Sequence, residues 1–270
     1  MAEVLASKAG NVHSEAAFED VSWLDFVTSA VIIGPLLERA GELGVGNTVL
    51  ACVCATKDAV GSNTNLGIIL LLAPLCAVPS GIKLAPGIED VLEGLDQGDT
   101  EMVYEAIRLA EPGGLGTVDA ADVRDPPPFG LIEAMGRAAD QDTVARQYVN
   151  GFSDVIGEIS PSLTQRDLPM DQLIVRTHLQ QMAREPDSLI RRKCGDAIAR
   201  ESASHAQAAL DAGWPFSQSG QAMFDELDAW LRGDGHRRNP GTSADLVTAG
   251  LFVALREGWV RQPFEWSLPL

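Results

Sequence analysis

The chain has 270 residues and a mass of 28.7 kDa, which suffices for one large domain or two small ones. Hydrophobic residues make up 46% of it, so a sizeable core can be buried, but aromatic residues at 6% leave Leu, Ile, Val and Ala to form that core. This composition favours packed helices over a β-sandwich. The formal net charge of −18 disfavours nucleic acid or anionic membranes as partners and otherwise serves solubility.

The first half of the chain predicts a series of helices. Apolar residues at helical spacing indicate helices over residues 18–43 and 47–59, each ended by glycine. The apolar run over residues 66–78 is hydrophobic on all sides, so we expect a helix at the centre of the fold, with Pro74 kinking or ending it. A loop over residues 80–87 and two short amphipathic helices over 88–95 and 100–110 complete this half.

Glycine and proline interrupt the helical pattern at residues 111–116 and 125–128. Asp142 and Asp187 then stand where helix N-caps are expected. No strand-like alternation and no repeat of fixed period occurs. We therefore expect one all-α, multi-helix domain over residues 1–270 with a central buried helix. Its later helices are predicted over residues 129–139, 143–159, 168–184, 187–212, 216–231 and 243–256.

The four cysteines show neither a disulfide framework nor the paired spacing of a zinc site. Cys52 and Cys54 lie in an apolar stretch and are expected to be small buried thiols. The N-terminus lacks the long apolar core of a signal peptide, and residues 66–78 are too few to span a membrane. These features indicate a cytoplasmic protein without a membrane or nucleic-acid partner, whether a monomer or a homo-oligomer.

Polar residues and glycine gather in three segments at or shortly before predicted helix starts. They are Lys8-Ala9-Gly10-Asn11-Val12-His13, Gly61-Ser62-Asn63-Thr64-Asn65-Leu66-Gly67 and Asn239-Pro240-Gly241-Thr242-Ser243-Ala244-Asp245. Helix N-termini offer unpaired amides to an anion, and glycine lets a ligand approach the backbone. N-capping by Asn63 or Thr64, and by Thr242 or Ser243, explains each segment alone. Four polar residues directly before a buried helix favour a ligand pocket.

Together the three segments resemble the triphosphoribosyl-dephospho-coenzyme A synthase family. Its pattern has Lys-Pro-Gly-x-Val near the start, Gly-x-Asn-Thr-His-Lys-Gly before an apolar helix, and Gly-Gly-Ser-Ala-Asp-Leu late in the chain. Residues 8–12, 61–67 and 240–246 match it in order and spacing along nearly the whole chain. The resemblance implies a transferase that moves a triphosphoribosyl group from ATP to dephospho-coenzyme A or a related acceptor and releases adenine, with Mg²⁺ on the triphosphate.

Two departures from the family pattern concern the substrate. Asn65-Leu66 stands in place of His-Lys, which removes a cation suited to a triphosphate, and Gly113-Gly114-Leu115-Gly116 stands in place of Arg-Gly-Glu-Ala. Both are similar to the archaeal and planctomycete-type branch. Two alternatives stay open: an enzyme of the same fold with another acceptor or donor in one-carbon coenzyme biosynthesis, and a non-catalytic nucleotide-binding protein.

Acidic residues and one histidine are the candidates for acid–base chemistry and for Mg²⁺. The catalytic candidates are Asp245, His13 and Asp20, and the metal candidates are Asp20, Asp119, Asp122 and Asp245. Asp119, Asp122 and Asp125 are spaced by three, so a helical turn would bring them to one face. Carboxylates with phosphate oxygens and water suit Mg²⁺, although a solvated acidic face explains the same spacing.

Amide, hydroxyl and basic side chains near the three segments are the candidates for binding the nucleotide. Arg192 and Lys193 belong to a basic cluster that suits phosphate but could also be a solvated helix face. The complete set is Lys8, Asn11, Ser62, Asn63, Thr64, Asn65, Gly114, Arg192, Lys193, Thr242 and Ser243.

Overall fold

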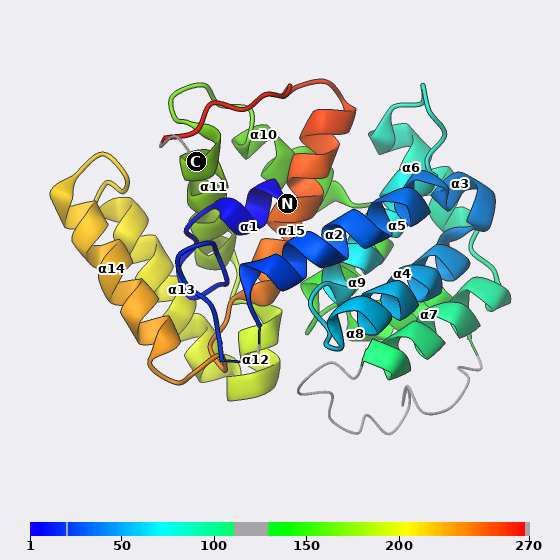
Figure 1. Cartoon of the computed structure of the whole chain (residues 1–270), viewed down its shortest axis with the longest axis horizontal. Coiled ribbons are helices and arrows are strands. Elements are labelled where there is room, and N and C mark those ends of the chain that lie inside the picture. The colour runs from blue at the N-terminus through cyan, green and yellow to red at the C-terminus, as the bar shows by residue number, and fades with distance from the viewer. Residues whose placement is uncertain (20, 111–128, 268–270) are drawn as a thin grey trace. The chain divides into compact units, whose positions relative to one another are not determined.

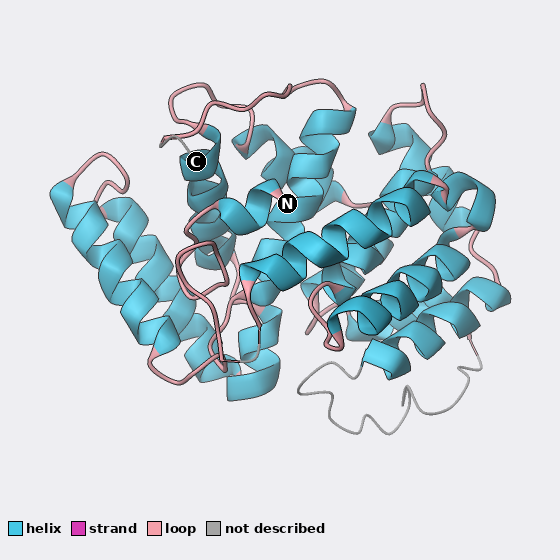
Figure 2. Cartoon of the chain, in the orientation of Figure 1, coloured by secondary structure: helices cyan, strands magenta, loops and turns pink. Residues whose placement is uncertain are grey.

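The computed structural model describes residues 1–19, 21–110 and 129–267, and in these ranges helices are joined by loops and turns (Figure 2). They contain fifteen α-helices and one π-helical turn, and no strand occurs in them. The predicted all-α fold is therefore confirmed. No described helix is both long enough and apolar enough to cross a membrane.

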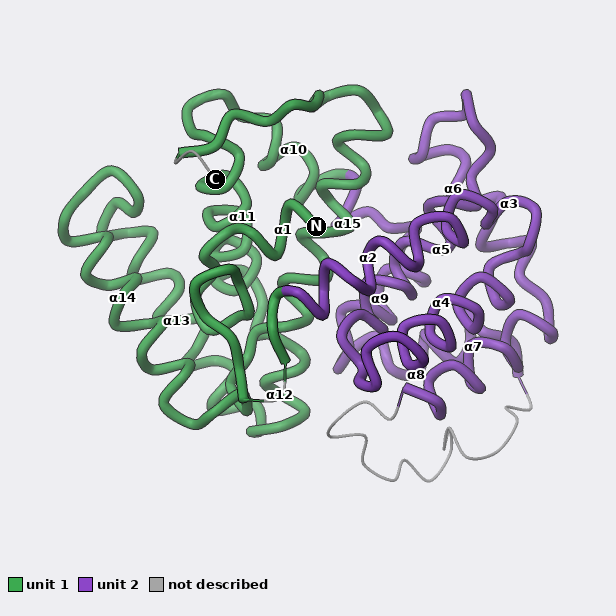
Figure 3. The backbone as a smooth tube through the Cα atoms, in the orientation of Figure 1, with its two compact units in different colours: residues 1–23, 157–270 green, residues 24–156 purple. Residues whose placement is uncertain are grey.

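The chain divides into two compact units, which Figure 3 shows in green and purple. Unit 1 consists of residues 1–23 and 157–270, and unit 2 of residues 24–156. The single domain expected from the sequence stays a prediction. The helices of unit 1 are α1 (Ala2–Leu5), α10 (Ser160–Ser162), α11 (Met170–Arg184), α12 (Ser188–Cys194), α13 (Asp196–Asp211), α14 (Gln218–Arg232) and α15 (Gly241–Arg256).

Unit 2 is built around the apolar helix α5. The chain enters this unit at the start of α2 and leaves it within the π-helical turn η1 (Val155–Ile159). Its helices are α2 (Trp23–Glu38), α3 (Ala40–Leu43), α4 (Val45–Val60), α5 (Leu66–Ala77), α6 (Leu84–Glu93), α7 (Gln97–Ala110), α8 (Leu131–Ala138) and α9 (Thr143–Val149). Helices α3, α4, α6 and α9 all pack against α5 (Figure 1), so the predicted buried helix forms the core of this unit.

Pro74 lies inside α5 and does not end it, because the helix continues to Ala77. A proline has no N–H, so the carbonyl of Leu70, four residues earlier, lacks its helical partner. The hydroxyl of Tyr148 on α9 replaces that partner and donates a hydrogen bond of 2.7 Å to the Leu70 oxygen. The missing backbone bond is thus compensated from a neighbouring helix.

Close packing of α4 on α7 depends on Gly46. A Cβ at this position would lie 2.5 Å from the Cα of Asp99, which no real contact allows. The backbone N–H of Gly46 instead donates to the Asp99 carboxylate at 2.7 Å. The contact explains why glycine stands near the start of α4.

In unit 1, α11 packs against α1, α13 and α15, and α13 packs in turn against α12 and α14. Ten of the fifteen residues of α11 are buried, including the polar side chains of Arg176, Thr177, His178 and Gln181. A helix with so many buried polar groups needs partners for them, and the partner of His178, the Pro240 carbonyl, belongs to the site described below.

Several predicted helix bounds were wrong, two of them because residues with positive φ end a helix. The helix predicted over residues 187–212 is interrupted at Gly195, whose φ of 90° cannot continue an α-helix. The helix predicted over residues 143–159 ends at Val149, before Gly151 and Phe152 adopt positive φ. The loop predicted over residues 80–87 is shorter, since α6 begins at Leu84, and the helix predicted over residues 18–43 is divided into α2 and α3.

Candidate functional site

The first polar segment follows α1 in unit 1, and its leading residue, Lys8, is completely buried. The Lys8 ammonium donates to the carbonyl of Glu3 at 2.8 Å and forms a 2.9 Å ion pair with the Glu3 carboxylate. A buried charge paired in this way is tolerated, whereas an unpaired one is very costly. Lys8 therefore holds the segment against α1, and its positive charge acts on the titratable side chains near it.

Residues on α14 hold the next part of this segment. The N–H of Gly10 donates to the Asp228 carboxylate at 2.7 Å, and the guanidinium of Arg232 donates to the carbonyl of Asn11 at 2.7 Å. Arg232 and Asp228 are also paired with each other at 2.9 Å. The pair thus binds one donor and one acceptor of the loop backbone.

The first and third segments meet in unit 1, although 228 positions separate the residues that join them. The side-chain amide of Asn11 donates to the Asn239 side-chain oxygen at 2.8 Å. On the following residue, the Pro240 carbonyl lies 3.3 Å from Nε2 of His178 on α11. The sequence prediction that these two segments belong together agrees with this contact, while the Gly61–Gly67 turn lies in unit 2.

Asp187 joins the third segment to α12. One carboxylate oxygen accepts from the N–H groups of Leu189 and Ile190 at 2.9 and 3.0 Å, which confirms the predicted N-cap. The other oxygen accepts from the N–H and hydroxyl of Ser243 at 2.7 and 2.8 Å. Burial raises the pKa of Asp187, and these four hydrogen bonds oppose that rise.

The predicted N-capping by Thr242 or Ser243 was wrong, because α15 begins at Gly241 and its N-cap is Pro240. Thr242 and Ser243 are instead buried in the first turn of the helix. Asp245, one turn further on, is half-buried on α15. The carboxylate of Asp187 takes over the role of a capping side chain from a distant part of the sequence.

His13 closes the first segment and is 8% exposed. Burial lowers its pKa to about 4, helped by the charges of Arg232 and Lys8, so the ring is neutral at pH 7. Nδ1 accepts a hydrogen bond of 3.3 Å from the N–H of Glu15, which places the proton on Nε2. His13 is therefore arranged to donate a hydrogen bond from Nε2.

The polar turn of unit 2 has two side chains engaged in structural contacts. Oδ1 of Asn63 accepts from the N–H of Leu66 at 3.1 Å, a capping contact at the start of α5, and the Thr64 hydroxyl lies 2.7 Å from the Ser29 hydroxyl. Ser62 is half-buried. Asn65, by contrast, is 6% exposed, and its buried Nδ2 has no hydrogen-bond partner among the described residues. An unpaired buried donor of this kind points to a missing acceptor.

Of the remaining candidates, two lie on α12 and four lie outside the described residues. Arg192 and Lys193 are half-buried in the last turn of α12. Asp20, Gly114, Asp119 and Asp122 lie outside the described residues. Within the described ranges, no group of three or more His, Cys, Asp or Glu side chains could hold a metal ion.

Sequence reasoning missed the residues that hold the two segments of unit 1 in place. His178, Asp228 and Arg232 contact loop backbone atoms far away in the chain, and no local motif marks them. A histidine in a helix as buried as α11 was the available signal, because such a side chain needs a polar partner.

Comparison with known proteins links this arrangement to one activity. Residues 1–264 match the family model described as ATP:dephospho-CoA triphosphoribosyl transferase. The fold is similar to a solved structure from Archaeoglobus fulgidus, described as a proposed triphosphoribosyl-dephospho-CoA synthase, with a TM-score of 0.68 and 27% sequence identity. That similarity covers 87% of this chain and 100% of the other. The comparison with curated proteins gave no match.

Proposed function

The chain belongs to the ATP:dephospho-CoA triphosphoribosyl transferase family, and we propose that segments 8–13 and 239–245 of unit 1 contribute to its substrate site. The enzyme transfers a triphosphoribosyl group from ATP to dephospho-CoA. The observation that carries this function is the match over residues 1–264, which includes all three polar segments. It does not favour the alternatives of another acceptor or a non-catalytic role.

The transfer sets definite chemical requirements. A hydroxyl oxygen of dephospho-CoA forms a bond to the ribose carbon that carries adenine, the bond from that carbon to adenine breaks, and the hydroxyl proton passes to a base. Positive charge develops on the ribose while the bonds exchange, so nearby carboxylates and oriented dipoles accelerate the step. The residues of this chain must therefore position two substrates, accept one proton and stabilise that charge.

Asp245 is our candidate for the base. It is half-buried on α15, one turn beyond Gly241, in the segment that Asn11, His178 and Asp187 hold in place. A fixed backbone reduces the motion of a catalytic carboxylate, which favours reaction when the substrate is bound. His13 is less suited to accepting a proton, because its Nδ1 is occupied and its Nε2 carries hydrogen. We assign His13 instead to donating a hydrogen bond to a phosphate oxygen.

Asn65 is our candidate for binding the nucleotide at the turn of unit 2. Its buried Nδ2 finds no acceptor in the part of the chain that the structure describes, and it lies at the N-terminus of α5, where the helix dipole also favours negative charge. A phosphate or ribose oxygen of ATP would provide that acceptor. This arrangement needs no lysine, which agrees with the presence of Leu66 after Asn65.

Mg²⁺ fits this proposal as a partner of the triphosphate. Mg²⁺ prefers a few carboxylates together with phosphate oxygens and water, and the triphosphate would supply the phosphate oxygens. The ion would supply neutralisation of phosphate charge, and the residues of the chain would orient the ribose.

Adenine release tests the function directly. The purified protein is incubated with ATP, Mg²⁺ and dephospho-CoA, and free adenine is measured by chromatography. We expect D245N to lower kcat at least about a hundredfold, as loss of a general base does, with little change in the KM for ATP. D225N, on the exposed face of α14, is the matched control and should retain full activity. Absence of adenine with the natural sequence would refute the assigned reaction.

A second assay tests the role of Asn65. N65A should raise the KM for ATP about ten- to a hundredfold, the effect of losing one hydrogen bond to a charged group. N65D keeps the shape but replaces the donor by a negative charge, and its KM should rise further. Equal KM values in all three proteins would remove Asn65 from the nucleotide site and leave the reaction itself unaffected.

The cytoplasm is the compartment that we assign to this enzyme. All four cysteines are free thiols, which is typical of a reducing compartment, and ATP is available there. Alkylation of the protein isolated under trapping conditions should modify the accessible thiols without prior reduction.

A further inference from the structure

Unit 1 contains a polar cavity that no part of the proposed site uses. Its volume is about 200 Å³, and it lies beside α11. Helix α11 contributes Thr177, Gln180, Gln181 and Arg184 to the lining, while Glu158 and Ser162 come from η1 and α10. The cavity is large enough for a small polar group and for several water molecules.

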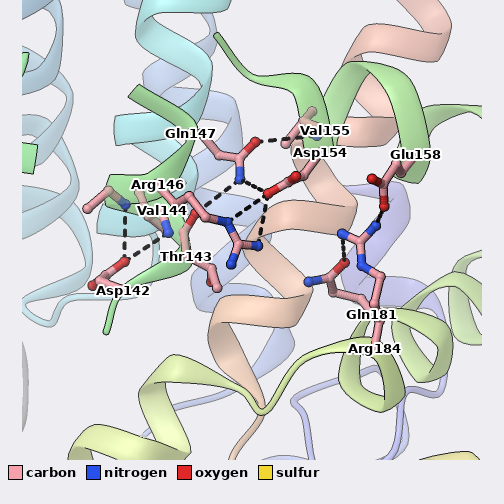
Figure 4. A network of polar contacts seen from close by, with 11 residues as sticks. Asp142, Thr143, Val144, Arg146, Gln147, Asp154, Val155, Glu158, Gln181 and Arg184 are labelled. Atoms are coloured by element: carbon pink, nitrogen blue, oxygen red, sulfur yellow. Dashed lines mark hydrogen bonds and ion pairs between the residues drawn. The ribbon is translucent and has the colours of Figure 1, made fainter. Parts of the chain in front are cut away.

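The charged groups of the cavity neutralise each other. The guanidinium of Arg184 forms an ion pair with Glu158 and donates to the side-chain oxygen of Gln181 at 3.0 Å (Figure 4). An anion entering here would meet the Glu158 carboxylate and would compete with it for Arg184. The cavity is therefore unsuited to a triphosphate and suited to an uncharged polar group.

Two lining residues carry polar atoms without a partner. Oγ1 of Thr177, a residue only 2% exposed, and Oε1 of Gln180 are buried and accept no hydrogen bond from the described residues. The Ser162 hydroxyl, in contrast, already donates to the Glu158 carbonyl at 3.1 Å. Buried polar atoms are usually paired, so Thr177 and Gln180 indicate that a hydrogen-bonding guest belongs in this cavity.

We propose that the cavity binds an amide of the pantetheine arm of dephospho-CoA. This inference rests on dephospho-CoA being the acceptor. Its arm is uncharged and carries amides, whose N–H can donate to Gln180 while a carbonyl accepts from the Thr177 hydroxyl.

The position of the cavity on α11 agrees with this assignment. His178, the neighbour of Thr177 in sequence, contacts the Pro240 carbonyl at the start of the segment that carries Asp245. One helix thus supplies residues to both the cavity and the support of the proposed base. The acceptor would be held by its arm, and discrimination between acceptors would depend on α11.

Separate KM values for the two substrates test the assignment. T177V and Q180M remove the polar atoms with little change in volume, and each should raise the KM for dephospho-CoA about five- to tenfold. The KM for ATP should stay within about twofold of its value in the natural protein. A merely structural defect would instead change the KM values of both substrates. Q180M also guards against misfolding, since Gln180 is less buried than Thr177.

A matched control lies nearby. T164V repeats the Thr→Val change at a hydroxyl bonded to Pro161 outside the cavity. It should leave the two KM values unchanged. If T177V and Q180M also leave the KM for dephospho-CoA unchanged, the proposal is overturned, and the cavity holds only water.

Calorimetric titration with pantetheine keeps this inference separate from the reaction. The full-length protein should bind pantetheine, and Q180M should bind it several-fold more weakly. Binding without any adenine release would refute the assigned reaction but support the cavity. Adenine release without pantetheine binding, together with an unchanged KM for dephospho-CoA, would refute the cavity alone.

Discussion

The hydroxyl of Tyr148 donates to the carbonyl of Leu70, the one backbone acceptor in α5 that Pro74 deprives of its helical partner. Tyr148 is 2% exposed, and burial raises its pKa above its ordinary value, so the hydroxyl remains a donor across the usual pH range. A proline in the most apolar helix of unit 2 is thus matched by a tyrosine on α9.

This pairing predicts a specific coupling between two substitutions. Y148F should destabilise the protein by about 1–3 kcal/mol, because the Leu70 carbonyl stays buried without a donor. P74A returns an N–H to the helix, so Y148F should cost about 1 kcal/mol less in that background. Urea denaturation of the four proteins gives the double-mutant cycle, and additive effects would contradict the explanation.

Gly10 allows a second prediction about stability, because both its backbone conformation and its close packing disfavour a side chain at this position. Its φ is 67°, and an added Cβ would lie 2.6 Å from Leu231 in the core. G10A should therefore cost about 2–4 kcal/mol through strain and overpacking. Gly61 has a similar φ of 78° but open space around it, so G61A should cost only about 1 kcal/mol. Equal losses of stability would mean that the Leu231 contact is unimportant.

Asp187 should contribute more to stability than the serine it binds. In D187N an NH₂ group, which cannot accept a hydrogen bond, replaces one carboxylate oxygen. It faces at least one of the backbone N–H donors of Leu189, Ile190 and Ser243, so we expect the free energy of unfolding to fall by about 2–4 kcal/mol. S243A removes one hydroxyl and leaves the backbone contact, for a loss of about 1 kcal/mol. Chemical denaturation measures both, and a larger effect of S243A would contradict the role given to Asp187.

Local features of the fold could be predicted from the sequence, and distant contacts could not. Asp142 and Asp187 could be identified as caps because a capping contact is local in sequence. Each accepts from N–H groups two and three residues ahead. The second oxygen of Asp187 reaches Ser243, 56 positions away, and nothing in the sequence near either residue indicates that contact. Gly195 was missed as a helix end because glycine within a helical pattern is often tolerated.

The candidate site divides in the same way. Glycine and polar residues marked segments 8–13 and 239–245, and Asn11 and Asn239 do lie within hydrogen-bonding distance. The residues that support them, His178 and Arg232, are placed by helix packing, which a sequence pattern of apolar spacing does not resolve into pairs. Resemblance to a family linked the segments, while the fold explains how the two in unit 1 are held.

The pH dependence of stability should report the two buried histidines. Their ordinary pKa is 6.5, and burial lowers it to about 4 for His13 and about 3 for His178. Below pH 6.5 the unfolded chain therefore binds protons that the folded chain excludes, so stability is complete above that pH and falls as the solution becomes more acidic. Each histidine adds up to about 1.4 kcal/mol per pH unit to the slope of the free energy of unfolding against pH.

Replacing His178 should remove its share of this slope. H178Q retains a side-chain N–H that can donate to the Pro240 carbonyl but cannot take up a proton in this range. Between pH 6.5 and 5 its free energy of unfolding should fall about half as steeply as that of the natural protein. H236Q, at an exposed position, is the control and should keep the original slope. An unchanged slope in H178Q would show that His178 is protonated in the folded state, which its burial beside the charge of Lys8 opposes.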